Sequence, residues 1–384
     1  MNKRNTVRRM AAVIFACLLF FSGLAFVGCG KKPAVLTLDG ITIEEDIYRY
    51  WLAKYKNYYI SQISEIGDNK ESFEKLTEDG VTVGEVIEDE AIQYAKAMLC
   101  SLKLFDEYGL KLSSSEKTLV KEMIDDNILY LGGGDRAEFN QLLLDTYGFS
   151  IDRLEEILLL EQKVEKLTSY LIDGGAIGYT ADELDAFYME NYYRVKIVFI
   201  NTTAKPKFDA EGKVQTDILG NMITEPLTDE EKAAKKGIAE EIFEKAKNGE
   251  NFDELVKKNS EFENKESYPN GYYISSYEFD ILLESGLPKQ LLLDSNNAKN
   301  GDVMMISDEK SGHYIVQKAA PEAGAYKKGH ADAAQLERVV GNLLQTKYDA
   351  LVDSVWDRIK VNEDLLAGIS IVDIKRGLNI GKIS

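Results

Sequence analysis

The stretch that decides the fold runs from Gly249 to Lys318. It contains four short runs: NGENFDELVKKNSE (248–261), NGYYIS (270–275), KNGDVMMIS (299–307) and SGHYIVQK (311–318). The first run predicts a short helix over 252–259. In the others, glycine precedes β-branched and aromatic residues, a pattern typical of strands that follow tight turns. We therefore predict strands over 271–274, 303–307 and 314–318.

The stretch has an upstream partner in RVKIVFI (194–200), which is rich in β-branched residues and predicts a strand. Residues 201–226 are polar, contain Gly and Pro, and predict an extended loop or a hairpin insertion. Residues 228–248 predict a helix. The resulting β-α-α-β-β order predicts a compact α+β unit over residues 192–321.

The N-terminus has the three parts of a secretory signal peptide. Four cations at positions 3, 4, 8 and 9 precede an apolar run over 10–27, which Gly28 ends. The pattern predicts a cleaved signal peptide over 1–28. A retained membrane-spanning helix is the alternative, since about 18 apolar residues can just cross a bilayer.

The end of this segment, LAFVGC (24–29), resembles a bacterial lipobox. Phe26 stands where lipoboxes prefer Leu. The resemblance implies that Cys29 receives a diacylglycerol and becomes the mature N-terminus, with residues 29–33 as a tether. Acyl chains anchor a protein stably because each buried methylene contributes about 0.8 kcal/mol.

Composition narrows the class of protein. The chain has 384 residues, 45% of them hydrophobic, and a formal net charge of −19 that cleavage would lower by four to −23. This acidity argues against a nucleic-acid partner. After cleavage and lipidation Cys100 is the one remaining cysteine, so no intramolecular disulfide is possible. Cys100 lies in an apolar helical run and is predicted to be a buried small hydrophobe.

Residues 34–191 have mostly helical periodicity and predict a helical domain. A strand over 35–38 and a tight turn at Asp39-Gly40 open it. Four capping boxes predict helix starts: Thr42 with Glu45, Ser113 with Glu116, Thr180 with Glu183, and Thr228 with Glu231.

The C-terminal part contains one strongly amphipathic segment over 331–359. Its wide apolar stripe predicts a single helix over 331–360 that packs on the N-terminal helical domain. Coiled-coil dimerisation is the alternative, although the stripe is wider than a two-in-seven seam. Residues 361–384 are predicted to be a tail.

The stretch that opens this section resembles the back half of a parvulin-type peptidyl-prolyl isomerase domain. The whole chain resembles the extracytoplasmic foldases called PrsA and SurA. Five segments match in order: AVLTLDGITIEEDIYRY (34–50), YGLKLSSSEKTLVKEM (108–123), DRAEFNQLLLDTYGFSIDRLEEILL (135–159), YTADELDAFYMENYYRVKIVFI (179–200) and the stretch itself. The resemblance implies an α+β chain in which a SurA/trigger-factor-like helical chaperone domain holds an inserted parvulin-like domain.

The sequence departs from this family where its catalytic histidines stand. Ile197 occupies the first histidine position and Tyr314 the second, while His313 lies one residue too early. A shift of one residue along a strand turns a side chain to the opposite face. The family's central Cys or Asp falls near Phe262-Glu263. We therefore expect weak or absent isomerase activity, with Tyr314 and His313 as the only catalytic candidates.

The expected function is a membrane-anchored, extracytoplasmic chaperone or foldase for newly secreted polypeptides, as in a Gram-positive cell. The alternatives are an active isomerase that uses Tyr314 and His313, and a solute-binding lipoprotein. Peptide-binding candidates are Ile197, Tyr272, Phe279 and Tyr314. No cofactor is expected, and two histidines without a cysteine pair predict no metal site. His330 is expected to be solvated in a polar loop, and a homodimer is left open.

Overall fold

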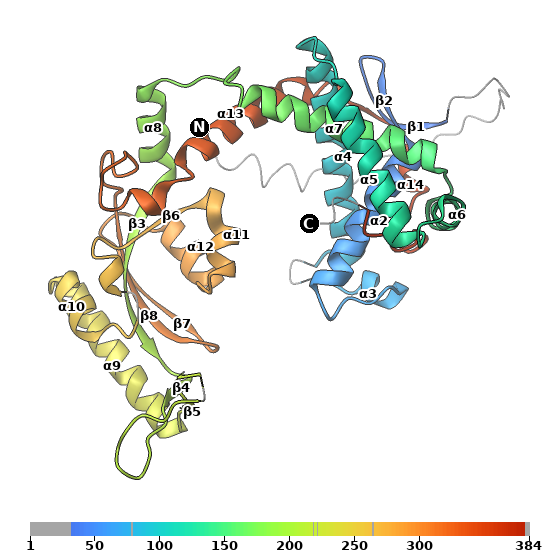
Figure 1. Cartoon of the computed structure of the whole chain (residues 1–384). Coiled ribbons are helices and arrows are strands. Elements are labelled where there is room, and N and C mark those ends of the chain that lie inside the picture. The colour runs from blue at the N-terminus through green and yellow to red at the C-terminus, as the bar shows by residue number, and fades with distance from the viewer. Residues whose placement is uncertain (1–31, 78–79, 218, 221, 263–264, 381–384) are drawn as a thin grey trace. The chain divides into compact units, whose positions relative to one another are not determined.

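The protein's computed structural model describes residues 32–77, 80–217, 219–220, 222–262 and 265–380 (Figure 1). The predicted signal peptide and the lipidation site Cys29 lie outside the described residues, as do most of the tether and Glu263. Within the described residues, none of the helices combines the length and the apolar character that crossing a membrane requires. Helices and antiparallel sheets both occur in quantity, which confirms the predicted α+β class.

The chain forms two compact units. Among the described residues, unit 1 comprises 32–95, Leu143–Phe149 and Lys360–Asn379, and unit 2 comprises Lys96–Leu142, Ser150–Ile359 and Ile380. Two helices, α4 (Val83–Glu107) and α6 (Arg136–Tyr147), contribute residues to both units. The domain limits expected from the sequence, with a helical part over 34–191 and a parvulin-like part over 192–321, remain predictions.

Unit 1 is built on a small sheet in the order β2-β1-β9. Strands β1 (Ala34–Leu38) and β2 (Ile41–Glu44) form a hairpin whose turn residues Asp39 and Gly40 have φ of 48° and 90°, as a tight two-residue turn requires. Helix α2 (Glu45–Gln62) follows directly, then α3 (Lys70–Glu74) and the first part of α4.

The capping box predicted at Thr42 is wrong. Thr42 lies in β2 opposite Thr37, and the N-cap of α2 is Glu44, which makes no side-chain capping hydrogen bond. Residues 41–44 pair with β1 as a strand instead, because the side chains of ITIE alternate between the inward and the outward face. The other three boxes are confirmed at α5 (Ser114–Leu131), α8 (Ala181–Asn191) and α9 (Asp229–Lys247).

The segment expected to be a tail is instead structured. Strand β9 (Lys360–Val361) pairs with β1, helix α14 (Glu363–Ala367) follows, and three isoleucines further on are buried: Ile369, Ile371 and Ile374. These elements are too short to leave a periodic signal in the sequence.

Unit 2 contains the long helices α5, α7 (Ile151–Leu171), α8 and α13. The predicted single C-terminal helix is shorter than expected, because a 3-10 turn, η3 (Ala333–Leu336), precedes α13 (Val339–Trp356). Its apolar stripe is covered within the chain. Val339 and Leu343 join a core cluster with residues of α8, and the Tyr348 hydroxyl lies 2.8 Å from Ser101 Oγ on α4.

A four-stranded antiparallel sheet lies between α8 and α13 in the sequence. Its order is β6-β3-β8-β7, with β3 (Tyr192–Asn201), β6 (Tyr272–Ser275), β7 (Val303–Asp308) and β8 (Gly312–Ala319). Helices α9 and α10 (Phe252–Asn259) cover one face through a cluster that contains Val198, Ile200 and Ile315. The predicted strands and the two predicted helices are therefore present, but the predicted β-α-α-β-β order is wrong, because two further helices lie between β6 and β7 and a short strand pair lies between β3 and α9.

Two helices of this region were not predicted. Helices α11 (Phe279–Glu284) and α12 (Lys289–Asn297) pack on the other face of the sheet.

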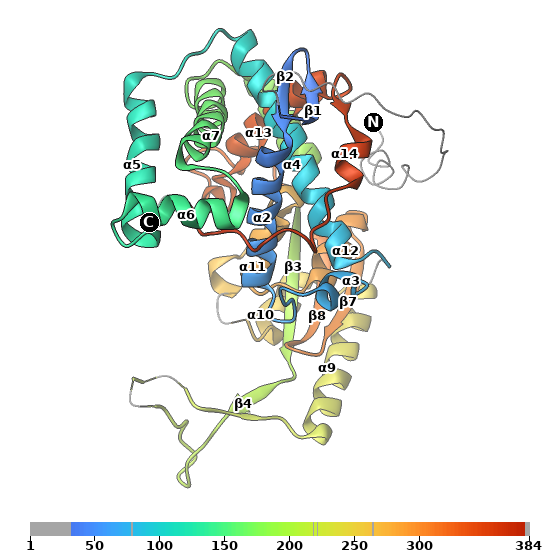
Figure 2. The same ribbon diagram turned by 90° about the vertical axis from the view of Figure 1, so that its right-hand side faces the viewer.

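The insertion over 201–226, predicted as an extended loop or a hairpin, contains the short antiparallel pair β4 (Ala204–Pro206) and β5 (Thr224–Pro226), which extends beyond the end of β3 (Figure 2).

A lysine joins α7 to the capping box of α5. The Lys166 ammonium lies 2.8 Å from Glu116 Oε2, and this hydrogen bond, helped by those from Ser113, lowers the pKa of Glu116 to about 2. Because the unfolded value is about 4.3, the pair's stabilisation is present above that pH and is lost as the pH falls toward about 2. We expect Glu116→Gln to flatten the decline of unit 2 stability over this pH window.

This prediction is checked by urea unfolding followed through Trp356 fluorescence, in a Trp51→Phe background, at a series of acidic pH values. Glu122→Gln, an exposed carboxylate on the same helix, is the matched control. Identical pH profiles for wild type and Glu116→Gln would contradict the assignment.

Candidate functional site

The two positions that the sequence assigns to the catalytic histidines lie on adjacent strands of the sheet. Ile197 on β3 pairs with Val316, and Tyr314 on β8 pairs with Phe199. Both side chains are only 2% exposed, and both belong to the apolar cluster under α11 and α12. A substrate therefore reaches Tyr314 only by opening this core, whereas Ile197 also borders a pocket at the edge of β3.

The Tyr314 hydroxyl makes a hydrogen bond within the protein. It donates to Ser311 Oγ at 2.8 Å, and Ser311 in turn donates to Asp308 Oδ2 at 2.5 Å. Burial raises the pKa of Tyr314, so the phenol stays neutral at ordinary pH. Ile197 has no side-chain hydrogen-bonding group. The pair thus has no means of supporting the nitrogen or carbonyl of a twisted imide.

His313 lies on the opposite face of the sheet from Tyr314. It pairs with Ile200 on β3, its Nδ1 lies 2.8 Å from Ser307 Oγ on β7, and its charged neighbours Lys236 and Glu240 are on α9. Burial, with the Lys236 charge adding, lowers the pKa of His313. The one-residue displacement therefore separates His313 from Tyr314, and no bulge in the β3–β8 register restores it.

Aromatic rings fill the position expected for the family's central Cys or Asp. The Phe262 ring stacks on Phe199 with centroids 4.8 Å apart and lies 6.1 Å from the Tyr314 ring. Phe199 and Tyr314 are themselves 4.8 Å apart. The three rings therefore surround this position with apolar surface.

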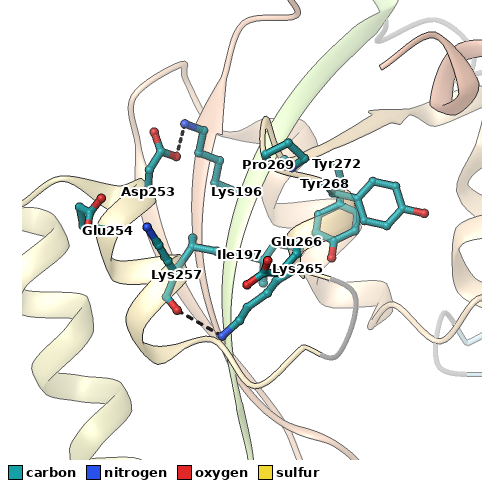
Figure 3. A pocket seen from close by; sticks show the side chains of 12 residues that line it. Lys196, Ile197, Asp253, Glu254, Lys257, Lys265, Glu266, Tyr268, Pro269 and Tyr272 are labelled. Atoms are coloured by element: carbon teal, nitrogen blue, oxygen red, sulfur yellow. Dashed lines mark hydrogen bonds and ion pairs between the residues drawn. The ribbon is translucent and has the colours of Figure 1, made fainter. Parts of the chain in front are cut away.

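A pocket of about 290 Å³ opens beside Ile197, at the edge of β3 (Figure 3). It exists because β6 pairs with β3 only as far as Val195. Beyond that point Ser260 takes the place of a strand: its Oγ accepts from the Phe199 N–H at 3.1 Å and donates to the Ile197 carbonyl at 3.3 Å. The pocket lies along this edge of β3 and is lined by residues of α10 and of the segment 265–272.

The pocket has an apolar lining and a charged rim. Ile197, Val256, Tyr268, Pro269 and Tyr272 supply most of the lining. Burial, with Tyr268 nearby, raises the pKa of Tyr272 to about 12, so its ring presents no charge. Such a lining suits a ring or branched aliphatic side chain.

Lysines order the rim of the pocket. Lys196 forms an ion pair with Asp253 on α10. Lys265 donates to the carbonyls of Lys257 at 3.2 Å and Ser260 at 2.6 Å, which ties the following loop to α10. The entrance of the pocket is therefore surrounded by acidic and basic side chains, while its interior is apolar.

The four peptide-binding candidates divide between the pocket and the core. Tyr272 and Ile197 line the pocket, whereas Phe279 and Tyr314 pack in the apolar cluster beneath α11 and α12. Tyr268 and Pro269 were not predicted. Their signal was the turn YPNG (268–271) directly before β6.

His330 is not simply solvated, contrary to expectation. Its Nε2 lies 3.3 Å from Glu322 Oε1, and its Nδ1 accepts from the Asp332 N–H at 3.2 Å. Asp332 is buried, and its Oδ2 accepts from Asn270 at 3.1 Å and from the Tyr273 hydroxyl at 3.2 Å. Polar side-chain atoms of Glu322, His330 and Asp332 lie within 4.8 Å of one another. Through Asp332 the loop that carries His330 is bonded to Tyr273 on β6, and both ring nitrogens of His330 contact protein groups.

Cys100 is fully buried, as predicted. Burial, with the Asp353 charge adding, raises the pKa of its thiol to about 12. The thiol is therefore protonated and acts as a small apolar side chain.

Comparison with known proteins gives a limited picture. No family model matches the chain, and no curated protein matches it. The chain is similar to solved PrsA proteins. PrsA from Bacillus subtilis is 19% identical, with 76% of this chain and 92% of that chain covered and a TM-score of 0.23.

Two further solved structures give similar values. The peptidylprolyl isomerase PrsA from Bacillus cereus is 16% identical over 76% of this chain and 94% of that chain, with a TM-score of 0.28. The foldase protein PrsA from Lactococcus lactis is 14% identical over 88% of this chain and 97% of that chain, with a TM-score of 0.21. TM-scores this low mean that the whole chains do not superpose, so no activity is carried over from them.

Proposed function

We propose that this chain is a membrane-anchored, extracytoplasmic chaperone or foldase for secreted proteins, and that its parvulin-like module binds polypeptide without isomerising proline. The observation that carries the proposal is the open pocket at Tyr268 and Tyr272 beside a catalytic frame closed over Ile197 and Tyr314. The lipobox at Cys29 and the five ordered sequence matches support the anchoring and the class of function.

Isomerisation of a prolyl bond has a barrier of about 20 kcal/mol. An enzyme lowers it with hydrogen-bond donors fixed where charge shifts in the twisted imide. Ile197 offers none, Tyr314 donates to Ser311, and His313 faces α9. The pocket instead offers apolar area that an unfolded client can occupy with a side chain. All sheet pairings among the described residues are antiparallel, which argues against the repeated βαβ lobes of a solute-binding protein.

One set of measurements tests the proposal. We expect purified protein to leave the isomerisation rate of a proline peptide at its uncatalysed value and to retard aggregation of an unfolded client. Tyr268→Ala should weaken binding of a fluorescent unfolded polypeptide, such as carboxymethylated lactalbumin, about tenfold, because one aromatic wall of the pocket is lost.

Tyr130→Ala is the matched control, since Tyr130 is an exposed tyrosine on α5 outside the pocket. Its client affinity should equal that of wild type. Turnover that disappears with Tyr314→Phe or His313→Ala would establish the alternative, an active isomerase. A folded protein with no effect on client aggregation at several-fold excess would overturn the chaperone proposal.

A further inference from the structure

Residues Ile369–Asn379, here called the strap, lie across unit 1 without forming a helix or a strand. Figure 2 draws this segment as a dark red coil that follows α14 and crosses α2. Both the strap and its contacts on α2, α4 and Leu143–Phe149 belong to unit 1. The backbone of the strap makes hydrogen bonds to the unit at Ile371, Ile374, Gly377 and Leu378. Its side chains add bonds from Lys375 to the Asp145 carbonyl and from Arg376 and Asn379 to the side chain of Asn57.

The first half of the strap, Ile369–Ile374, is bound by a buried lysine and a carboxylate. Lys56 on α2 donates from Nζ to the carbonyl of Ile371 at 3.1 Å and to the carbonyl of Ile374. Glu88 on α4 accepts from the Ile371 N–H at 2.6 Å. These partners recognise peptide groups, which every polypeptide has.

In the second half of the strap, residues 375–379, backbone hydrogen bonds bring the chain close to α2 and to Tyr147. The Gly377 N–H donates to the Ala53 carbonyl at 3.2 Å, and the Leu378 N–H donates to the Tyr147 hydroxyl at 2.7 Å. A Cβ at position 377 would lie 2.6 Å from the Ala53 carbonyl oxygen, so glycine alone fits against α2. The groove floor therefore contacts main chain rather than side chains at this point.

The strap also buries aliphatic side chains that recur every three residues. Ile371 and Ile374 are three residues apart, and Gly377 follows three residues later. A methyl of Ile371 lies so close to Gly84 that a Cβ there would come within 3.1 Å of it. Each buried isoleucine contributes roughly 1.5–3 kcal/mol of apolar burial.

We propose that the groove beneath the strap is a docking site for an extended, unfolded segment of a client polypeptide, and that the strap occupies it when no client is bound. The ligand is a segment with branched aliphatic residues three apart and a small residue three further on. Lys56 and Glu88 would bind its backbone as they bind the strap. The inference rests on the proposed client-handling function and assigns it a second site, in unit 1.

The strap competes with clients from within the same chain. Its effective concentration is on the order of millimolar, as for short flexible connections. A client segment therefore displaces it only when it fills the groove better or binds the pocket of unit 2 as well. Freeing the strap should raise the affinity of the groove for peptides added in trans.

The test uses the full chain with Gly377→Val, which forces the second half of the strap off α2. The probe is a fluorescein-labelled peptide of residues 366–379. We expect it to bind the Gly377→Val chain at least tenfold more tightly than wild type, and a probe peptide with the same Gly377→Val change to bind neither. Carboxymethylated lactalbumin should displace the bound probe.

Failure of the probe to bind a folded Gly377→Val chain would overturn the proposal. Binding of the probe without displacement by the unfolded protein would overturn the client role of the groove, while client binding that depends on Tyr268 would still support the proposed function. If Gly377→Val fails to fold, hydrogen exchange on the wild-type chain decides. Saturating client should speed exchange of the Ile371, Gly377 and Leu378 amides several-fold, and unchanged rates would overturn the inference.

Discussion

Lys56→Met should lower the free energy of unfolding of unit 1 by about 3 kcal/mol. The Lys56 side chain is 2% exposed, and its ammonium donates to the carbonyls of Ile371 and Ile374. It also lies 2.7 Å from Asp68 Oδ1 and 4.9 Å from the centroid of the Phe73 ring. Methionine fills a similar volume but has no donor.

The size of the effect follows from the groups left behind. The Ile374 carbonyl would lose the ammonium donor, and so would the Ile371 carbonyl, which keeps only a hydrogen bond from the Ile374 N–H at 3.3 Å. Each such loss costs roughly 1–3 kcal/mol. Asp68 is partly exposed and regains water, so it adds little. The measurement is urea unfolding of a Trp356→Phe background, in which Trp51, buried in unit 1, is the only tryptophan.

Lys70→Met on α3 is the control, because Lys70 is exposed and its bond to Glu74 spans 3.4 Å at the surface. We expect it to change the free energy of unfolding by less than about 0.5 kcal/mol. Equal effects of the two substitutions would show that Lys56 does not hold the strap.

Gly271→Ala should lower the free energy of unfolding of unit 2 by about 3 kcal/mol. Gly271 has φ of +92°, where an L side chain is strained, and a Cβ there would collide with the Val195 carbonyl oxygen. β6 would have to move away from β3, taking Tyr272 and one wall of the pocket with it. Client binding at the pocket should therefore weaken together with stability.

Gly301→Ala is a close control for this prediction. Gly301 has φ of +95°, and a Cβ there would meet no atom within 4 Å. It should cost about 1 kcal/mol from backbone strain alone. Both variants are measured by Trp356 fluorescence in a Trp51→Phe background, and equal losses would rule out a role for the Val195 contact.

Local signals in the sequence were reliable where a few neighbouring residues complete an interaction. Three capping boxes formed because Ser or Thr and Glu three residues later need only each other and a helix start. Thr42 carried the same signal, but no capping box formed there, because Thr42 pairs with Thr37, five residues earlier, in the β1–β2 hairpin. The helices α11 and α12 were missed because each is only about two turns long or less and gains its stability from the sheet face it covers.

The residue identities show that positions 197 and 314 carry isoleucine and tyrosine instead of histidine. Strand alternation also predicts that His313 lies on the opposite face of the sheet from Tyr314. The sequence did not indicate that the vacated positions are closed by Phe199 and Phe262, nor that an open pocket lies next to them. The interpretation of His330 as solvated failed for the same reason, since its partners Glu322 and Asp332 meet only when the loop folds back.

The stretch from Gly249 to Lys318, together with residues 194–200, thus predicted the α+β class and the strands along the chain, and the residue identities at 197 and 314 showed that neither position carries an imidazole. These properties depend on residue type and on alternation over a few positions. The pocket at Tyr268 and Tyr272, and the strap gripped by Lys56, depend on contacts between segments tens to hundreds of residues apart. Such contacts form when apolar faces and unpaired backbone groups from distant segments pack together. Local sequence patterns therefore do not predict them.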